Sequence, residues 1–424
     1  MRLWRLFGLD TATSAERRAT FWVAVMFFAS LAGTFLVRPL RSQFGVDRGV
    51  DALPYLYSLT LAATVGVVLP FWWLANRMPS RRFVPIVLHV CALGLVLLAA
   101  GLTTVGDYEW SRVPWFGEVF WGSYNALNVA VPALVWIHAV EHFGRSQAKR
   151  LFGFVAVGGT VGAVTGSWAA GALSDAPIWV GALVAAGLLE VAFLAFRASW
   201  PHCRRLEGGD SGERYAPGGL LQGVRIVFRD RRAGQIALYM MLIGVLATAF
   251  YAAQTELVGK ELRRGSEQHA WLADVELYSQ GLVLLLQLFA TGRLMSRLPA
   301  VALLVSLPVV SIAGLGVWWL APTAVAIFAV QLVRRGAQFA FEKPAREVLY
   351  TPLELATKHK VKFLLDTFAF RLGDLCGAWL QVGLRRFEFD VGWIVLATVF
   401  FALLWIALGF SLGRTQRPAV VAIS

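Results

Sequence analysis

Long apolar stretches alternate with short polar segments along the whole chain. A helix needs roughly 20 apolar residues to cross the hydrocarbon core of a bilayer, because no backbone polar group can be left unpaired there. Twelve stretches meet this requirement: 20–38, 54–74, 83–103, 117–139, 151–172, 178–198, 233–253, 270–290, 300–320, 322–342, 362–384 and 391–411. The pattern predicts an all-α membrane protein with twelve transmembrane helices.

One polar segment is longer than the others and divides the pattern in two. Residues 199–232 are rich in glycine, proline and charge. We therefore predict a six-helix bundle over 1–198, a cytoplasmic linker over 199–232 and a second six-helix bundle over 233–424. Two motifs recur at matching places and favour a pseudo-symmetric 6+6 duplication. They are R-x-x-S-R at Arg77–Arg81 and Arg293–Arg297, and G-x-x-x-G-x-W at Gly162–Trp168 and Gly373–Trp379.

The composition supports a membrane protein and shows an excess of basic residues that has two possible explanations. The 424 residues are 58% hydrophobic and only 15% charged, whereas soluble chains carry about 25% charged residues. Lys and Arg number 39 against 26 Asp and Glu, a net charge of +13. A basic excess suggests nucleic acid, but cytoplasmic loops of membrane proteins also collect Lys and Arg.

The placement of the basic residues distinguishes between these two explanations. With both termini inside, 27 of the 39 fall in the inside segments and at the helix ends beside them, and 9 fall outside. This bias predicts a multi-pass protein of a bacterial-type inner membrane with both termini cytoplasmic. Nucleic acid is not an expected partner, because its readers need one exposed basic surface. Residues 1–18 show no apolar run of a cleavable signal peptide.

Polar side chains recur at helical spacing inside several predicted helices. An ionisable side chain near the bilayer centre costs roughly 2.5–3.5 kcal/mol, so such residues face a cavity or a partner. The candidate substrate-binding residues from these stripes are Arg38, Arg41, Asn125, Asn128, Gln280, Arg334, Arg335, Gln338, Lys362 and Arg371, and the candidate gating or coupling residues are Glu342, Asp366 and Asp374.

The cation excess on these faces favours a small anionic substrate. Arginine presents a planar fork that suits phosphate or carboxylate. The sequence has no G-x-x-x-x-G-K-[ST] loop, so any nucleotide is expected to be cargo rather than fuel, and no cofactor is predicted. The simpler alternatives are that Arg38 and Arg41 reach to the interface, and that Arg371 forms an internal salt bridge with Asp374 or Asp366.

Three other sequence features have simpler interpretations. Residues His138–His142 match H-x-x-E-H, an inverted zinc-protease pattern. No third zinc ligand is evident, so neither a metal nor a catalytic residue is predicted. The three cysteines are too scattered for a disulfide framework. Gly158, Gly162 and Gly166 recur every fourth residue, which favours close helix packing over a nucleotide loop.

Two segments resemble the plastid-type and bacterial ATP/ADP antiporters. Residues 141–153, EHFGRSQAKRLFG, are similar to that family's fourth loop, and residues 341–381 are similar to its late signature. The matching features of the second segment are Arg346-Glu347, Tyr350-Thr351-Pro352-Leu353, Lys358, Lys360, Lys362, Asp366 and Arg371-Leu372-Gly373. The likeness extends over nearly the whole chain.

The resemblance implies a major-facilitator-like fold, a cavity lined mainly by helices 1, 4, 7 and 10, and nucleotide exchange across the membrane. It adds Lys360 to the substrate-binding candidates and places Arg41 where the family has a functional lysine. Where the family has an acidic residue in helix 4, this chain offers Asn125 or the earlier Glu118. We expect a secondary transporter, ATP/ADP among its cargoes, acting as a monomer. The alternatives are a carrier of a drug or lipid-like solute and a non-transporting scaffold or zinc hydrolase.

Overall fold

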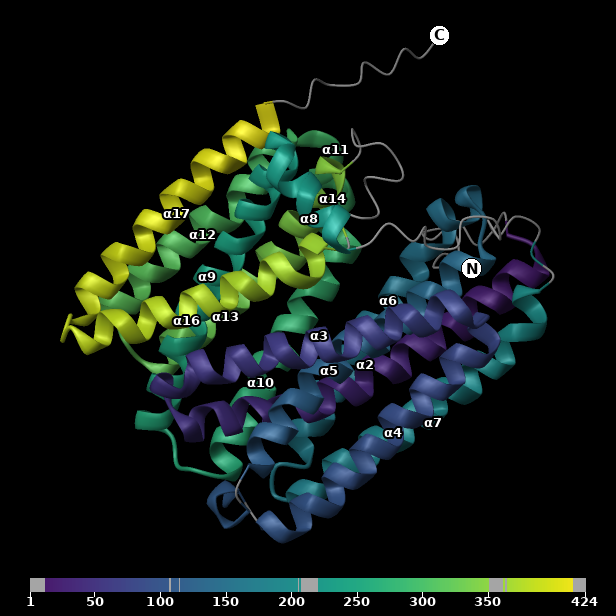
Figure 1. Ribbon diagram of the computed structural model, residues 1–424, viewed down its shortest axis with the longest axis horizontal. Helices are drawn as coiled ribbons and strands as arrows, with labels where there is room; N and C mark the ends of the chain where they lie inside the picture. Colours follow the sequence, from purple (N-terminus) through teal and green to yellow (C-terminus); the bar gives the residue numbers. More distant parts are fainter. Residues whose placement is uncertain are drawn as a thin grey trace. The chain divides into compact units, whose positions relative to one another are not determined.

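The computed structural model describes residues 12–414 except 107, 114, 205, 207–219, 351–360 and 363, and these residues form helices and no strand (Figure 1). The first helices are α2 (Ser14–Arg48), α3 (Leu53–Arg77), α4 (Ser80–Val105), α5 (Phe116–His142), α6 (Arg145–Ala172), α7 (Ile178–Cys203) and α8 (Leu220–Arg229). The later ones are α9 (Arg231–Glu261), α10 (Ser266–Leu286), η3 (Gln287–Thr291), α11 (Gly292–Arg297), α12 (Ala300–Leu320), α13 (Ala324–Ala337), η4 (Gln338–Glu342), α14 (Lys343–Leu349), η5 (Leu365–Ala369), α16 (Phe370–Arg386) and α17 (Val391–Arg414).

Each predicted apolar stretch corresponds to helical segments in the described part of the chain. Ten helices there are long and apolar enough to cross a membrane. The stretches 117–139 and 362–384 correspond to α5 and to η5 with α16, which are not among these ten. The all-α class is confirmed.

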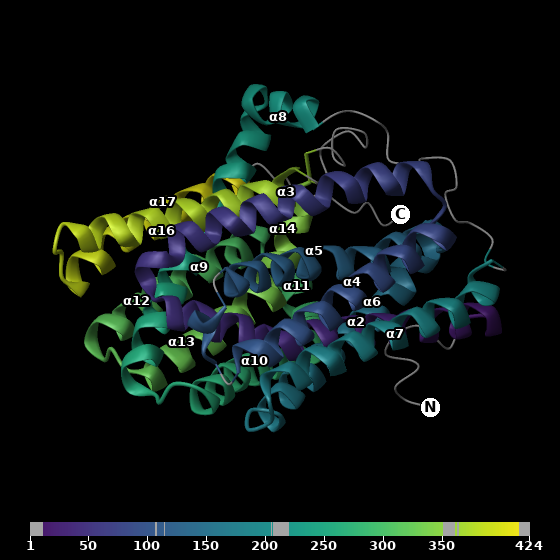
Figure 2. The same ribbon diagram turned by 60° about the horizontal axis from the view of Figure 1, so that its bottom comes forward.

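The starts of two helices, α2 and α9, follow from capping residues in the sequence. Thr13 and Glu16 form a reciprocal pair at the start of α2: the Glu16 N–H donates to Thr13 Oγ1 at 3.2 Å, and the Thr13 N–H donates to Glu16 Oε2 at 2.7 Å. Asp230 Oδ1 accepts from the Ala233 N–H at 2.7 Å and begins α9. Figure 2 shows α8 running at a steep angle to the helix that follows it, so the chain turns at Asp230.

The chain forms two compact units. The first comprises Met1–Asp47, Ala62–Tyr215 and Leu262–Leu284, and the second comprises Arg48–Leu61, Ala216–Glu261 and Leu285–Ser424. These units follow the predicted bundles 1–198 and 233–424 except at 48–61 and 262–284, which belong to the unit of the other half. The bundle boundaries remain a prediction.

The first unit has a core of apolar side chains from five helices. Met26, Leu88, Leu134, Leu151 and Phe196 come from α2, α4, α5, α6 and α7 in turn, and each is at most 3% exposed. Helix α4 runs along α7 (Figure 1). The two polar stripes of this unit, on α2 and α5, are held by this core.

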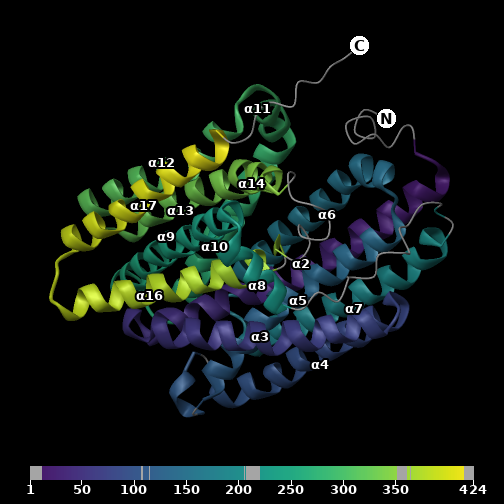
Figure 3. The same ribbon diagram turned by 45° about the horizontal axis from the view of Figure 1, so that its top comes forward.

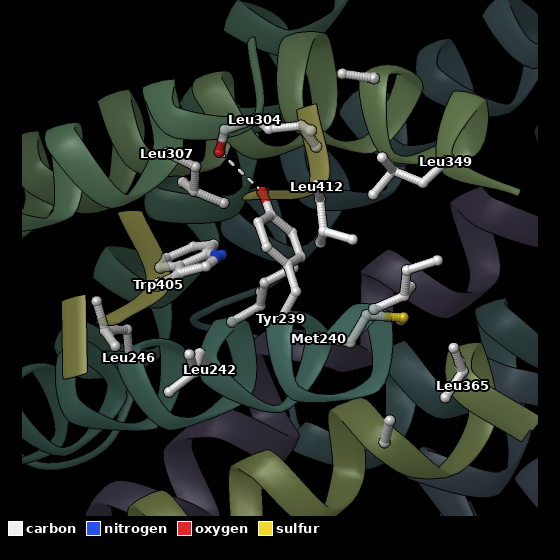
Figure 4. Packing of buried hydrophobic residues seen from close by; sticks show 14 of the residues in the cluster. Tyr239, Met240, Leu242, Leu246, Leu304, Leu307, Leu349, Leu365, Trp405 and Leu412 are labelled. Atoms are coloured by element: carbon white, nitrogen blue, oxygen red, sulfur yellow. Dashed lines mark hydrogen bonds between the residues drawn. The ribbon is translucent and has the colours of Figure 1, made fainter. Parts of the chain in front are cut away.

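The second unit is built around Tyr239 of α9 (Figure 4). Its hydroxyl donates to the Leu304 carbonyl of α12 at 2.8 Å. The Tyr239 and Trp405 rings meet edge to face with centroids 5.6 Å apart, which ties α17 to α9. Helix α12 in turn packs against both α13 and α17 (Figure 3).

In each half, a glycine brings the fifth helix into backbone contact with the first helix of the same half. A Cβ on Gly162 of α6 would lie 2.2 Å from the Phe28 carbonyl oxygen of α2, and one on Gly373 of α16 would lie 2.1 Å from the Met241 carbonyl oxygen of α9. Only glycine permits such close approaches between spanning helices. The G-x-x-x-G repeats therefore join the fifth helix to the first in each half, as a 6+6 duplication requires.

Three helices of the second unit contain a π-helical turn that the sequence pattern did not indicate. The turns are η3, η4 and η5, and η3 contacts η4. A π turn inserts one extra residue into an α-helix, and such turns are frequent at functional sites. Glu342 is the last residue of η4, and Asp366 lies within η5.

Candidate functional site

The predicted site residues fall into three groups, each inside one compact unit. The α2–α10 cluster belongs to the first unit and contains Arg38, Arg41, Trp121, Asn125 and Glu276. The α9–α13 cluster belongs to the second unit and contains Phe250, Gln254, Gln331 and Arg334. The π-turn cluster, also in the second unit, contains Glu342, Lys343, Arg346, Glu347, Lys362 and Asp366.

Arg38 forms an ion pair in the α2–α10 cluster. Its Nε lies 3.1 Å from Glu276 Oε1, and the two side chains are 30% and 4% exposed. Two further contacts join the same helix to residues 262–284: Gln43 Nε2 donates to Gln268 Oε1 at 2.6 Å, and Arg264 Nε lies 2.9 Å from Asp47. The end of α2 is therefore held by a row of polar contacts.

A double-mutant cycle on Arg38 and Glu276 measures how much this ion pair contributes to the free energy of unfolding. Removing one partner leaves a buried charge uncompensated, so Arg38→Gln or Glu276→Gln alone should lower stability, and the double variant should recover part of the loss. Because Arg38 is partly exposed, we expect a coupling free energy of about 1–2 kcal/mol, below that of a fully buried pair. Thermal unfolding of the purified protein measures it.

The exposed pair of Arg112 and Glu109 is the control, with side chains 56% and 53% exposed. The same cycle there should give a coupling free energy of about 0–1 kcal/mol. Equal coupling energies for the two pairs would contradict a structural role for Arg38 and Glu276.

Arg41 lies over an aromatic ring of α5. Its Cζ is 3.5 Å from the centroid of the Trp121 ring, a close cation–π contact. Asn125, one turn later, is 2% exposed and its Nδ2 donates to the Trp121 carbonyl at 2.8 Å. Asn128 is half-buried, and Gln280 of α10 is 7% exposed.

Trp121 escaped sequence reasoning because the chain holds 17 tryptophans. Its position one turn before Asn125, on a helix with a polar stripe, was the available signal. Glu276 was visible in the stripe of the eighth predicted helix, but nothing in the sequence marked it as the partner of Arg38.

Arg334 is the buried cation of the α9–α13 cluster. It is 5% exposed, and its Nη2 donates to Gln331 Oε1 at a long 3.4 Å. Gln331 Nε2 donates in turn to Gln254 Oε1 at 3.0 Å, and the Arg334 Cζ lies 5.2 Å from the Phe250 ring centroid. The N–H groups at Nε and Nη1 find no acceptor in the described part of the chain.

Other candidates of the second unit are paired or half-buried. Arg371 Nη1 donates to Asp374 Oδ2 at 3.2 Å, which is one of the two internal salt bridges considered as alternatives to a role in substrate binding. Thr248 Oγ1 donates to the Asp374 carbonyl at 3.2 Å. Arg335 and Gln338 are half-buried.

The π-turn cluster places three acidic and three basic side chains near one another. Lys362 donates to Glu347, and Arg346 Nη1 lies 3.5 Å from Glu342 Oε1. Glu342 is fully buried, whereas Asp366 and Lys343 are exposed. Lys360 lies outside the described residues.

The H-x-x-E-H segment is part of helix packing in the first unit. His138 is fully buried, its Nε2 lies 2.8 Å from Ser199 Oγ, and its carbonyl is 2.9 Å from His142 Nδ1. Among the residues that the structure describes, no three His, Cys, Asp or Glu side chains are grouped as metal ligands.

Comparison with known proteins gives a likeness in structure alone. No protein-family model matches the chain, and no curated protein matches it in sequence. A bacterial homolog of the human lysosomal transporter Spinster, in an inward-facing and unoccupied conformation, is similar over 96% of this chain and 100% of its own, with 13% identity and a TM-score of 0.62.

Two other solved transporters give similar values. The nucleoside transporter NupG is 14% identical over 94% of this chain and 98% of its own, with a TM-score of 0.61. An auto-inhibited peptide transporter of the POT family is 14% identical over 94% of this chain and 97% of its own, with a TM-score of 0.63. At these identities the likeness shows the fold, a multi-pass helical fold of the major-facilitator type.

Proposed function

We propose that the protein is a secondary transporter that moves a nucleotide or a related organic anion across the membrane by alternating access. Its fold is shared with solved transporters, and a two-bundle helical protein of this kind transports by turning one bundle against the other around a site near the midplane. The positive-inside bias supports cytoplasmic termini. The cargo is inferred from the side chains, since a fold does not determine cargo.

The observation that carries the proposal is the state of Arg334. This guanidinium is 5% exposed, forms no ion pair within the described residues, and keeps two N–H groups without an acceptor. Asp374 lies within electrostatic reach of this charge, but buried N–H donors that lack an acceptor still cost free energy. A phosphate or carboxylate would satisfy both groups with its oxygens, in the two-point geometry that arginine favours.

The α2–α10 cluster supports an anionic cargo. Stacking on Trp121 holds the Arg41 guanidinium cation within this cluster and fixes its plane. Buried amides, Asn125 and Gln280, lie on the same elements. Together with the resemblance of residues 341–381 to the ATP/ADP antiporters, these features favour a nucleotide, exchanged for another nucleotide.

A carrier of a non-nucleotide solute is the second candidate, and one observation favours it. Arg38 and Arg371 each lie against their own carboxylate, Glu276 and Asp374. Two of the predicted substrate-binding arginines are thereby neutralised, as expected if the intramembrane charges serve structure rather than cargo.

Uptake of labelled ATP and ADP into proteoliposomes tests the proposal. We expect uptake that rises when the vesicles contain unlabelled nucleotide, because an exchanger carries one nucleotide out for each nucleotide that it carries in. Parallel vesicles loaded with nucleoside, dipeptide or buffer alone are the controls. Uptake of no nucleotide by protein shown to be folded would exclude the first candidate, and uptake of an uncharged solute would favour the second.

A further inference from the structure

Glu342 is a fully buried carboxylate without hydrogen bonds in the described structure. It is 0% exposed, and neither Oε1 nor Oε2 accepts a hydrogen bond from a described residue. Arg346 Nη1 lies 3.5 Å from Oε1, which is too far for the short charge-assisted bond of a strong ion pair. A buried carboxylate in this state costs free energy that either a hydrogen-bond donor or a bound proton removes.

The backbone around Glu342 is irregular in the way that functional helices often are. Glu342 ends the π turn η4, and Asp366 lies in the π turn η5. Such π turns are rare, and they occur frequently at functional sites. Two acidic side chains therefore occupy two π turns of the same compact unit, and one is buried while the other is exposed.

Charged and titratable groups lie near Glu342 on some of the elements around it and not on others. Helix α9 contributes Tyr239, whose hydroxyl lies close to the Glu342 carboxyl and donates to the Leu304 carbonyl, whereas the contacting elements α12 and η3 contain no titratable side chain. The preceding helix α13 ends with Arg334 and Arg335. The remaining groups, on α14 and on the segment that leads into α16, are Lys343, Arg346, Glu347, Tyr350, Lys362 and Asp366.

The charge balance of this cluster links Glu342 to an anion. Glu347 is neutralised by Lys362, and exposed Asp366 and Lys343 are opposite in charge. Arg346, 8% exposed, has Glu342 as its buried counter-charge and exposed Asp366 as a second acidic group within electrostatic reach. If Glu342 binds a proton, Arg346 loses that counter-charge and its buried positive charge favours an incoming anion.

We propose that Glu342 is a proton-binding site, and that its proton is taken up together with the anionic cargo. Arg346 pairs with the Glu342 carboxylate when the proton is absent and is available to the cargo when the proton is bound. Exposed Asp366 gives protons a polar entry beside the buried carboxyl. Linkage then requires that the anion tighten proton binding as much as the proton tightens anion binding. The coupling to cargo rests on the proposed function; proton binding itself does not.

Infrared difference spectroscopy of the protein in lipid vesicles tests the proton site without any transport. Spectra taken at low and high pH should contain a carbonyl band of a buried carboxylic acid that titrates. The band should vanish in Glu342→Gln and persist in Glu190→Gln, a matched change in α7 at a residue bonded to His89. A wild-type spectrum without the band, or a band that survives in Glu342→Gln, overturns the proposal.

Removal of the Glu342 charge could leave Arg346 uncompensated and disturb folding, so Glu342→Gln with Arg346→Gln serves as the second variant. It removes both charges while keeping both side chains close in shape. The band should be absent from it as well. Its presence in this folded double variant would also overturn the proposal.

Labelled ATP uptake into vesicles without internal nucleotide tests the coupling. An inward proton gradient, acid outside, should raise wild-type uptake about tenfold. The ratio of gradient-driven uptake to exchange should fall about tenfold in Glu342→Gln and stay at the wild-type value in Glu190→Gln. Wild-type protein could exchange ATP while its uptake does not change with the proton gradient and its spectrum contains no titrating band. In that case the inference fails and the proposed function stands. If the band is present but no nucleotide moves, the proton site stands and the proposed function fails.

Discussion

Arg334→Gln is expected to lower anion uptake by about tenfold to a hundredfold, because hydrogen bonds to a charged group contribute about 1.5–3 kcal/mol. Glutamine keeps much of the length of the side chain but loses the charge and the fork of N–H donors. The two N–H groups of Arg334 that lack an acceptor in the described structure are the donors that we expect the anion to use, and this change removes them together with the contacts to Gln331 and Phe250. Initial rates of labelled ATP or ADP uptake into proteoliposomes measure the loss.

The matched control for Arg334 is Arg48→Gln, the same change at an exposed position. Uptake by this variant should stay within about twofold of wild type, because an exposed charge is screened by water and salt. Arg334→Lys should fall between the two, since lysine keeps the charge without the planar fork. Equal losses for Arg334→Gln and Arg48→Gln would remove Arg334 from the binding site.

The second large effect is expected at the close helix contacts. Leucine in place of Gly373 would place its Cβ 2.1 Å from the Met241 carbonyl oxygen, which is a backbone atom that cannot move alone. The helices α16 and α9 would have to separate along their contact. Overpacking of this kind costs about 1–3 kcal/mol in ordinary cores, and we expect the upper end or more here because backbone faces backbone. Thermal unfolding and the yield of folded protein measure it.

Gly383, in the same helix α16, gives a direct control, because a Cβ there meets nothing within 4 Å. Gly383→Leu should unfold near the wild-type temperature. The pair Gly162→Leu and Gly153→Leu repeats the comparison in α6, where Gly162 contacts the Phe28 carbonyl and Gly153 is open. A melting temperature of Gly373→Leu equal to that of Gly383→Leu would show that the two helices are not in backbone contact.

The helices could be predicted from sequence because the bilayer imposes one length and one composition on all of them. Their ends were less predictable. The predicted stretch 20–38 lies in the longer α2, which continues to Arg48 through a polar stripe, and α13 starts at Ala324 because the Thr323 hydroxyl accepts a hydrogen bond from the Ala326 N–H. The π turns were not predicted, although Pro344, just after η4, removes an N–H from the helical hydrogen bonds of that turn and was a local signal for an irregular helix there.

The candidate site was predictable where its contacts are local. The pair of Arg371 and Asp374 follows from a spacing of three residues on one helix. The pair of Arg38 and Glu276 joins distant parts of the chain, so no spacing could reveal it. The burial of Glu342 was likewise hidden, because a polar stripe shows which helix face a residue occupies but not how deeply the neighbouring helices cover it.

The division of α3 and α10 between the compact units bears on how the chain becomes folded. Residues 48–61 are made early in synthesis but belong to the second unit, and residues 262–284 are made late but belong to the first. A ribosome that has released only residues 1–198 has therefore not yet supplied a complete first unit. We therefore expect that neither half completes its compact unit before the other has been synthesised, so that the two halves depend on each other during assembly.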